Sequence, residues 1–365
     1  MKRAVLMLAA LAATIGASAA KPLYFGGDLS FANEMNDCGA VYRDGGAVKD
    51  VYTIFKDHGA NLVRIRLWTD GNPTHYSNLA DVEKSIHRAH AAGMQVLLDF
   101  HYSDSWADGD KQVIPKAWAG IADTPALAQT LYQYTFDTLS ALDREGLMPE
   151  MVQVGNEINQ EMLGQEDWKG RPIDWARNAA LINAGIKAVR DAGAKSAIKP
   201  RVMLHIAQPE NVEPWFAAAV KAGVTDFDVI GISYYSKWSK YSVANLGTEI
   251  YRLTHIYKAD VMVVETGYIW TTAWKDTSPN TLSEDSVARG YPATRDGQAK
   301  FLTDVTQAVL SNGGVGVVYW APDWVSTDCQ TQWGRGSSWE NATLFDFDGN
   351  ALPGLDFMKQ PAGGN

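Results

Sequence analysis

The sequence predicts one (β/α)8 barrel, a closed ring of eight parallel strands with helices outside, from three observations. Eight short apolar runs alternate with longer helical patterns along about 345 residues. Several helical patterns end at a glycine, and the next apolar run follows closely, which is the spacing of a repeated βα unit. The runs are continuously apolar, as expected of parallel strands buried on both faces. Eight such units fit a single barrel of this length.

Each element is expected from its local pattern. The expected strands are Leu23–Gly27, Leu62–Leu67, Gln95–Phe100, Met151–Val154, Val202–Ile206, Val229–Ser233, Val261–Val264 and Gly316–Trp320. The expected helices are Val48–His58, Asp81–Ala92, Pro125–Glu145, Trp175–Ala192, Glu213–Ala222, Val243–Tyr257 and Asp296–Ser311. A doubly wound nucleotide-binding sheet is disfavoured, because no G-x-G-x-x-G follows the first strand. The irregular segment after Trp320 predicts an elaborated loop after strand eight.

Residues 1–20 are typical of a secretory signal peptide, which leaves residues 21–365 as the single barrel domain. Lys2 and Arg3 precede an apolar stretch, from about Ala4 to Ile15, that ends in small residues. The stretch is too short to span a bilayer. We therefore expect a secreted or periplasmic protein with no membrane partner.

The chain is acidic, with 32 Lys and Arg against 42 Asp and Glu. Removal of Lys2 and Arg3 changes the net charge from −10 to −12. An acidic surface repels phosphates, which argues against nucleic acid and anionic lipid as partners. The charge also favours a neutral substrate over an acidic one, and we expect the protein to be a monomer.

Two glutamates directly follow buried strands: Glu157 ends the run VQVGNE, and Glu265 ends VMVVE. Active sites of such barrels lie where the strands end, and strands four and seven lie on opposing sides of the ring. Two facing carboxyl groups are the equipment of glycoside hydrolysis, one as proton donor and the other attacking or activating water. The structural alternative places Glu157 in a capping turn and pairs Glu265 with Arg64 or Arg66.

Several strings resemble glycoside hydrolase family 53, the endo-β-1,4-galactanases of a large barrel clan. They are FANE (31–34), RIRLW (64–68), LLDFHYSDSWADGDKQVIPKAW (97–118), VQVGNEIN (152–159) and VVETGY (263–268). The resemblance extends from about Leu23 to the C-terminus. The HYSDxWAD segment is its most specific part, whereas the Asn-Glu pair occurs across the clan and specifies no substrate.

The resemblance implies a role for each candidate residue. Glu157 would be the acid/base and Glu265 the nucleophile of a retaining double displacement, with Asn156 bonded to the sugar 2-hydroxyl. Arg64 would orient Glu265, although a one-residue shift in register would give this role to Arg66. The other residues expected to bind substrate are Asp28, Trp68, His101, Asp104, Trp106, Tyr234 and Trp320.

Some residues have a second explanation or depart from the family. Asp104 could cap a loop, and His205 is equally well explained as a hydrogen-bonded core residue. Gly109 stands where we expect proline after Trp-Ala-Asp, which predicts a looser third loop. Loop 271–286 lacks the closely spaced oxygen ligands with which some bacterial relatives bind calcium, and the histidines show no metal-binding spacing. We therefore expect no metal and no cofactor.

The two cysteines, Cys38 and Cys329, follow the first and the eighth expected strand. These strands are neighbours in a closed barrel, and export permits oxidation of thiols. We expect a disulfide that joins the first and last loops, and the alternative is two unrelated buried thiols.

Tryptophan is unusually frequent, with 13 residues in 365. All but Trp175 and Trp215 fall at the ends of expected strands or in the loops that follow them. Indole rings stack on the apolar faces of sugars, so this distribution indicates an extended carbohydrate cleft. Trp118 and Trp339 are expected only to pack loops.

The expected function is hydrolysis of internal β-1,4-galactosidic bonds of a neutral polysaccharide, the (arabino)galactan side chains of pectin. One alternative is another retaining endo-glycanase of the clan, a mannanase, cellulase or xylanase. A second alternative, from a different class of protein, is a carbohydrate-binding barrel without catalytic activity.

Overall fold

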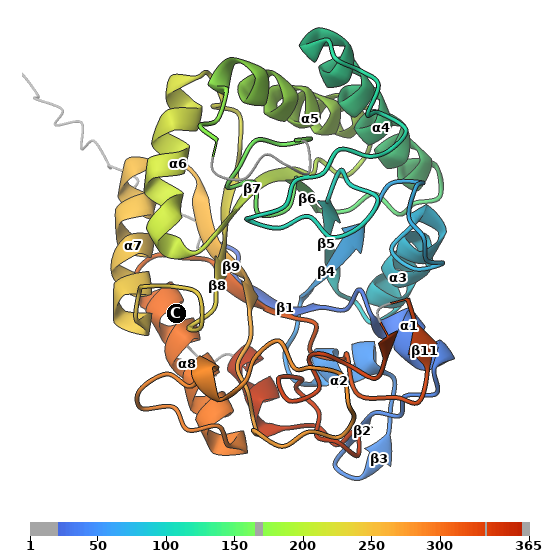
Figure 1. The fold of residues 1–365 in the computed structure, drawn as a ribbon, viewed down its shortest axis with the longest axis vertical. Coiled ribbons are helices and arrows are strands. Elements are labelled where there is room, and N and C mark those ends of the chain that lie inside the picture. Colours follow the sequence, from blue (N-terminus) through green and yellow to red (C-terminus); the bar gives the residue numbers. More distant parts are fainter. Residues whose placement is uncertain (1–20, 165–170, 333, 360–365) are drawn as a thin grey trace, which may run out of the picture.

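The computed structural model describes residues 21–164, 171–332 and 334–359, which form a single closed barrel (Figure 1). The expected signal peptide lies outside these residues, as do Trp168 and Trp333. The ring has eight parallel strands in the order β1-β10-β9-β8-β7-β6-β5-β4. They are β1 (Tyr24–Asp28), β4 (Leu62–Leu67), β5 (Gln95–Phe100), β6 (Met151–Val154), β7 (Arg201–Ala207), β8 (Val229–Tyr234), β9 (Asp260–Thr266) and β10 (Gly316–Trp320). The predicted fold class is confirmed.

Helices surround the ring (Figure 1). They are α1 (Ala32–Asp37), α2 (Val51–Asp57), α3 (Leu79–Ala91), α4 (Thr124–Arg144), α5 (Trp175–Lys195), α6 (Pro209–Lys221), α7 (Val243–Ile256) and α8 (Arg295–Ser311). Two 3-10 turns, η1 (Glu284–Ser286) and η2 (Pro353–Met358), and two hairpins, β2–β3 (Arg43–Asp44 and Ala47–Val48) and β11–β12 (Gln330–Thr331 and Gly334–Arg335), complete the described elements.

The largest differences from the predicted helix starts, three and four residues, occur at α2 and α6. Helix α2 begins at Val51 rather than Val48, since the Asp50 carboxylate accepts a hydrogen bond from the Tyr52 amide at 2.9 Å. Helix α6 begins at Pro209 rather than Glu213, and proline suits a first helical position because no amide donor is needed there.

The barrel interior is apolar at one end and polar at the other. An inner cluster that includes Leu62, Leu97, Met151 and Met203 fills the amino-terminal ends of the strands. A second and larger cluster packs the outer face of the strands against the helices. Two residues further along β4, β5 and β7, the inward positions hold polar side chains, so the functional groups stand on a packed apolar base.

A bulge in the pairing of β8 with β9 directs Glu265 into the barrel. Met262 and Val264 both belong to the inner cluster, so regular alternation would turn Glu265 outward. The register shifts between Ile232 and Ser233, and Ser233 pairs with Glu265. An extra residue of this kind re-aims the side chains that follow it.

The segment 321–352 after β10 forms the elaborated loop that the sequence predicted. It contains the β11–β12 hairpin, and much of it is buried against the barrel, including Trp324 and Trp339. A disulfide joins Cys329 in this loop to Cys38 at the end of α1, across 291 residues of sequence. Among the described helices, none has the length and apolar character needed to cross a membrane.

We expect the Cys38–Cys329 disulfide to stabilise the fold by restricting the unfolded chain. Replacing both cysteines by serine should lower the free energy of unfolding by about 2–4 kcal/mol, measured by urea denaturation. The matched control is the unmodified protein in the presence of a reductant, which should lose a similar amount. Equal stability of the reduced and oxidised proteins would contradict this expectation.

Candidate active site

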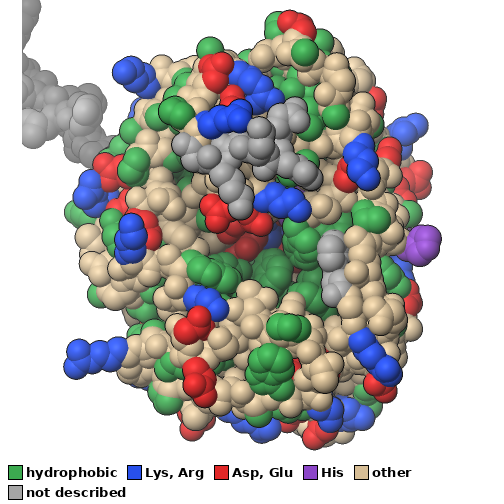
Figure 2. Space-filling view, viewed as in Figure 1, with side chains coloured by type: hydrophobic (Ala, Val, Ile, Leu, Met, Phe, Trp, Pro, Cys, Tyr) green, Lys and Arg blue, Asp and Glu red, His purple; other side chains and the backbone are tan. Residues whose placement is uncertain are grey.

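A cleft of about 1110 Å³ opens at the carboxyl-terminal ends of the strands. Figure 2 shows it as a hollow near the centre of the face, with acidic and hydrophobic side chains in its floor. Its walls come from the loops that follow β5, β6, β7, β8 and β10. The cleft is lined by eight of the residues that the sequence singled out: Asp28, Arg64, His101, Trp106, Asn156, Glu157, Glu265 and Trp320.

Arg64 lies beneath this cleft and contacts three carboxylates. Its side chain is fully buried on β4. Nη1 lies 2.7 Å from Asp28 Oδ2 and 2.8 Å from Glu265 Oε1, and Nη2 lies 2.8 Å from Asp99 Oδ2. The guanidinium is a direct cationic partner of all three carboxylates. Without such a partner, the dry interior would strongly disfavour their negative charges.

The same guanidinium positions the amide of Asn156. Nη2 donates to Asn156 Oδ1 at 2.7 Å, and Nε donates to Gln153 at 3.1 Å. Asn156 Nδ2 donates to the carbonyl of Ala107 at 2.8 Å. The amide nitrogen has two N–H groups, so one of them is still available to a ligand in the cleft.

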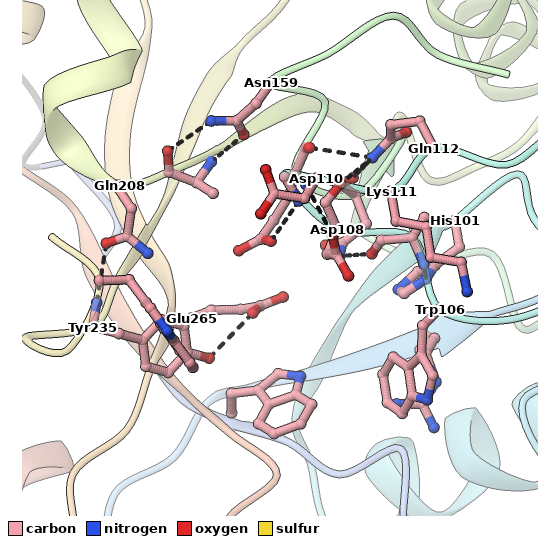
Figure 3. A pocket seen from close by; sticks show the side chains of 18 of the residues that line it. His101, Trp106, Asp108, Asp110, Lys111, Gln112, Asn159, Gln208, Tyr235 and Glu265 are labelled. Atoms are coloured by element: carbon pink, nitrogen blue, oxygen red, sulfur yellow. Dashed lines mark hydrogen bonds between the residues drawn. The ribbon is translucent and has the colours of Figure 1, made fainter. Parts of the chain in front are cut away.

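Glu265 has two direct partners of its own. Arg64 contacts Oε1, and the Tyr235 hydroxyl donates to Oε2 at 3.2 Å (Figure 3). Burial is the largest influence and raises the pKa of Glu265 above its usual range; Arg64 opposes the rise, and the nearby Glu157 adds to it. Because a guanidinium touches only one of these two glutamates, we assign the negative charge of the pair to Glu265.

Glu157 has uncharged donors. Its carboxyl Oε1 accepts from the Ser233 hydroxyl at 2.5 Å, and Oε2 accepts from the Gly109 amide at 3.1 Å. Burial raises the pKa of Glu157, whereas these two hydrogen bonds lower it. The residue has a φ of 44° and follows Gly155, whose φ is 85°, so the chain turns sharply after β6 to present this side chain.

His101 supports the floor of the cleft as a neutral imidazole. Its Nε2 lies 2.9 Å from Asp99, while Nδ1 accepts hydrogen bonds from the Trp68 indole at 3.2 Å and the Ala107 amide at 3.3 Å. Burial lowers the pKa of His101, although Asp99 opposes this. The proton therefore resides on Nε2 and points at Asp99.

Aromatic rings form the cleft wall near β10. Trp320 meets Trp339 edge to face with ring centroids 4.7 Å apart. Phe31 stacks on Trp324 at 4.2 Å. Trp106 lies with its ring 4.2 Å from the guanidinium carbon of the buried Arg66 on β4, so Arg66 supports the wall. Arg64, two residues earlier on β4, is the arginine that contacts Glu265.

Three of the residues expected to bind substrate do not line the cleft. Tyr234 faces the helix layer, where its ring stacks on Phe301 of α8 and its hydroxyl donates to a backbone carbonyl. Asp104 ties two loops together through Thr69 and the Lys116 amide, which agrees with the capping alternative. Trp68 is buried behind Trp106, and its indole nitrogen donates to His101.

The structure brings forward residues that the sequence reasoning missed as cleft residues. Tyr235, one position after Tyr234, is the tyrosine that reaches Glu265, and strand alternation could have indicated it. Trp339, expected only to pack a loop, lines the cleft although it is buried. Trp238, one of the tryptophans that the sequence assigned to the predicted cleft, does line it, with 47% of its surface exposed. Ser233 lies at the end of β8, and nothing in the sequence singled it out.

Within residues 21–164, 171–332 and 334–359, no group of three or more His, Cys, Asp or Glu side chains is arranged to hold a metal ion. His205 is fully buried, and its ring contacts Asn156 at 2.9 Å and the Ser233 hydroxyl at 2.8 Å. Burial holds the pKa of His205 well below its usual range. It is a hydrogen-bonded core residue beneath the acidic pair.

Replacing Arg64 with leucine should destabilise the fold by about 3–5 kcal/mol at neutral pH, because three buried carboxylates lose their counter-charge. The loss should shrink as the pH falls, since protonated carboxyl groups no longer need a cation. Urea denaturation at neutral and mildly acidic pH measures both effects. The control is Lys300→Ala, which breaks an exposed helix ion pair with Asp304 and should cost less than about 1 kcal/mol. An equal loss in the two variants would refute this account of Arg64.

Comparison with known proteins agrees with the geometry. The family model for glycosyl hydrolase family 53 matches residues 24–358. The chain is 52% identical to an arabinogalactan endo-β-1,4-galactanase of Cellvibrio japonicus, over 97% of this chain and 95% of that protein. It is 33% identical to an endo-β-1,4-galactanase of Bacillus subtilis, over 93% of this chain and 86% of that protein.

Solved structures extend the likeness to the fold. The catalytic domain of a family 53 protein from Ignisphaera aggregans superposes with a TM-score of 0.84 at 32% identity, covering 92% of this chain and 95% of the other. A Cellvibrio japonicus xylanase superposes with a TM-score of 0.57 at 14% identity, covering 92% and 96%, which shows only a shared fold. The chain belongs to glycosyl hydrolase family 53 and is a glycoside hydrolase.

Proposed function

We propose that this protein is an exported, retaining endo-β-1,4-galactanase that cleaves internal bonds of galactan or arabinogalactan. The observation that carries the chemistry is a pair of glutamates in one cleft with opposite environments. Glu265 has a direct guanidinium partner, whereas Glu157 has uncharged donors. Unequal environments of this kind separate a nucleophile from an acid. The named activities of the Cellvibrio and Bacillus relatives support the substrate.

In the first step, the ionised Glu265 attacks the anomeric carbon of the sugar bound above it, and the carbon–oxygen bond to the leaving chain breaks. Glu157 transfers its proton to that oxygen, so the leaving chain departs as an alcohol. Arg64 and the Tyr235 hydroxyl hold the two Glu265 oxygens and so fix the direction of attack. The available Asn156 N–H is suited to the sugar 2-hydroxyl.

In the second step, Glu157, now ionised, accepts a proton from water as the water attacks the same carbon. The bond to Glu265 breaks, and the sugar leaves with its original anomeric configuration. Glu157 must therefore be stable in both protonation states. The opposing influences on its pKa, burial on one side and the Ser233 and Gly109 hydrogen bonds on the other, are suited to this double role.

The cleft shape supports an enzyme that acts within a polymer. Aromatic rings line one side of the cleft: Trp320, Trp324 and Trp339 lie toward β10, and Trp238, after β8, packs on the Tyr235 ring that Trp339 also contacts. A neutral polysaccharide can lie across such a surface with its sugar faces on indole rings. The predicted signal peptide and the absence of a membrane-spanning helix among the described residues are compatible with export.

A substrate panel of potato galactan, galactomannan, xylan and cellulose tests the specificity. We expect depolymerisation of galactan alone, with a rapid fall in viscosity because the bonds cut are internal, and proton NMR should show the β-anomer of the product first. Cleavage of only another polymer would replace the proposed substrate. Binding without cleavage would replace the proposed catalysis.

A Glu265→Ala variant tests the role of the nucleophile. Turnover should fall by several orders of magnitude, because no carboxylate remains to form the covalent intermediate. Azide, added with an aryl β-1,4-galactobioside, should restore part of the activity and yield a galactobiosyl azide of inverted configuration at the reacting carbon. Leu282→Val, a change in a buried side chain of the loop after β9, serves as the control. Strong residual activity of Glu265→Ala without azide would contradict the assignment.

A further inference from the structure

The loop between β5 and α4 contacts the Glu157 carboxyl through a backbone amide. The Gly109 N–H donates to Oε2 at 3.1 Å, while Ser233 holds Oε1 from β8. Glu265, by contrast, contacts the side chains of Arg64 and Tyr235. One amide of the Asp108–Lys111 turn therefore takes part directly in holding the acid/base.

This amide is held in place by the rest of its turn. Asp108 and Lys111 exchange two backbone hydrogen bonds, at 2.8 and 3.0 Å, and the Asp110 amide donates to the Asp108 side chain at 2.8 Å. Three hydrogen bonds thus tie the turn that carries the Gly109 amide.

Gln112 connects the turn to the backbone of the acid/base. Its Nε2 lies within hydrogen-bond distance of three carbonyl oxygens: Asp108 at 2.9 Å, Asn156 at 2.8 Å and Glu157 at 3.2 Å. Gln112 therefore links the backbone next to the Gly109 N–H with the backbone of Glu157, whose carboxyl accepts from that N–H. A hydrogen bond built in this way is already in place when substrate arrives.

The identity of residue 109 determines whether this hydrogen bond exists. Proline, which the family resemblance led us to expect here, has no amide hydrogen and cannot donate. Gly109 is not among the glycines with a positive φ, so its backbone does not require glycine. A methyl group placed on it would lie 3.3 Å from the Ala207 side chain, a close contact that a small shift relieves.

We propose that Gly109 is a positioning residue of this enzyme, whose backbone N–H orients Glu157 and favours its ionised form. The proposal rests on the proposed acid/base role of Glu157. Burial and the nearby Asp108 charge favour the protonated carboxyl, and a donor on Oε2 opposes them. The donor thus helps Glu157 lose its proton in the first step and stabilises the carboxylate that is present between the two steps.

The pH profile of kcat/KM distinguishes this role from a merely structural one. Activity should fall on the alkaline side as free Glu157 loses its proton. Gly109→Pro removes a donor to the ionised form, so the pKa of Glu157 should rise and the alkaline limb should move up by about one pH unit. Gly109→Ala keeps the N–H, and its alkaline limb should coincide with that of the unmodified protein.

A second measurement does not depend on the proline variant folding. In protein labelled with ¹⁵N-glycine, the Gly109 amide signal, assigned by its absence from Gly109→Ala, should titrate with the midpoint of the alkaline limb. The titration should disappear in Glu157→Gln. An amide signal insensitive to pH across the limb, or a Gly109→Pro limb identical to that of Gly109→Ala, would overturn the proposal. Neither measurement requires that galactan be the natural polymer, which the substrate panel tests separately.

Discussion

One buried guanidinium organises the catalytic end of this barrel. Arg64 contacts Asp28, Asp99 and Glu265, and without it three acidic groups would lie close together in a dry interior. Its position follows from the alternation of β4, because Leu62 belongs to the apolar base and the next inward residue reaches the polar layer. The same cation places the charge on Glu265 and aligns the Asn156 amide. Stability and chemistry are therefore coupled at a single side chain.

Much of this arrangement is encoded in local patterns. Continuous apolar runs predicted the eight strands, and the two glutamates were found because each directly follows such a run. The family resemblance named Arg64 as the partner of Glu265, with Arg66 as the alternative, and the structure has the Arg64 contact. The strands and the positions of the glutamates depend only on residues near one another in sequence, so local patterns were enough to predict them.

The features that were missed depend on contacts between distant segments. The bulge opposite Ser233 turns Glu265 inward, and no pattern within β9 indicates it. Tyr234 was named from the family resemblance, whereas Tyr235, the next residue after β8, is the tyrosine that reaches Glu265. The partners of Asp104 lie in two different loops, so its bridging role appears only once those loops are folded together. Side chains in loops are positioned by tertiary contacts, which a linear pattern does not contain.

The position of the ring closure has a consequence for how the chain reaches this fold. Every other pair of neighbouring strands in the ring consists of strands that follow one another along the chain. The exception is β1, the first strand, which pairs with β10, the last, so that Tyr24 lies opposite Gly316. The first strand is made early in synthesis and must wait for nearly the whole chain before its second edge is covered. Closure of so long a loop is slow, and an open strand edge invites pairing with other chains. The barrel is thus most vulnerable to aggregation just before its last strand arrives.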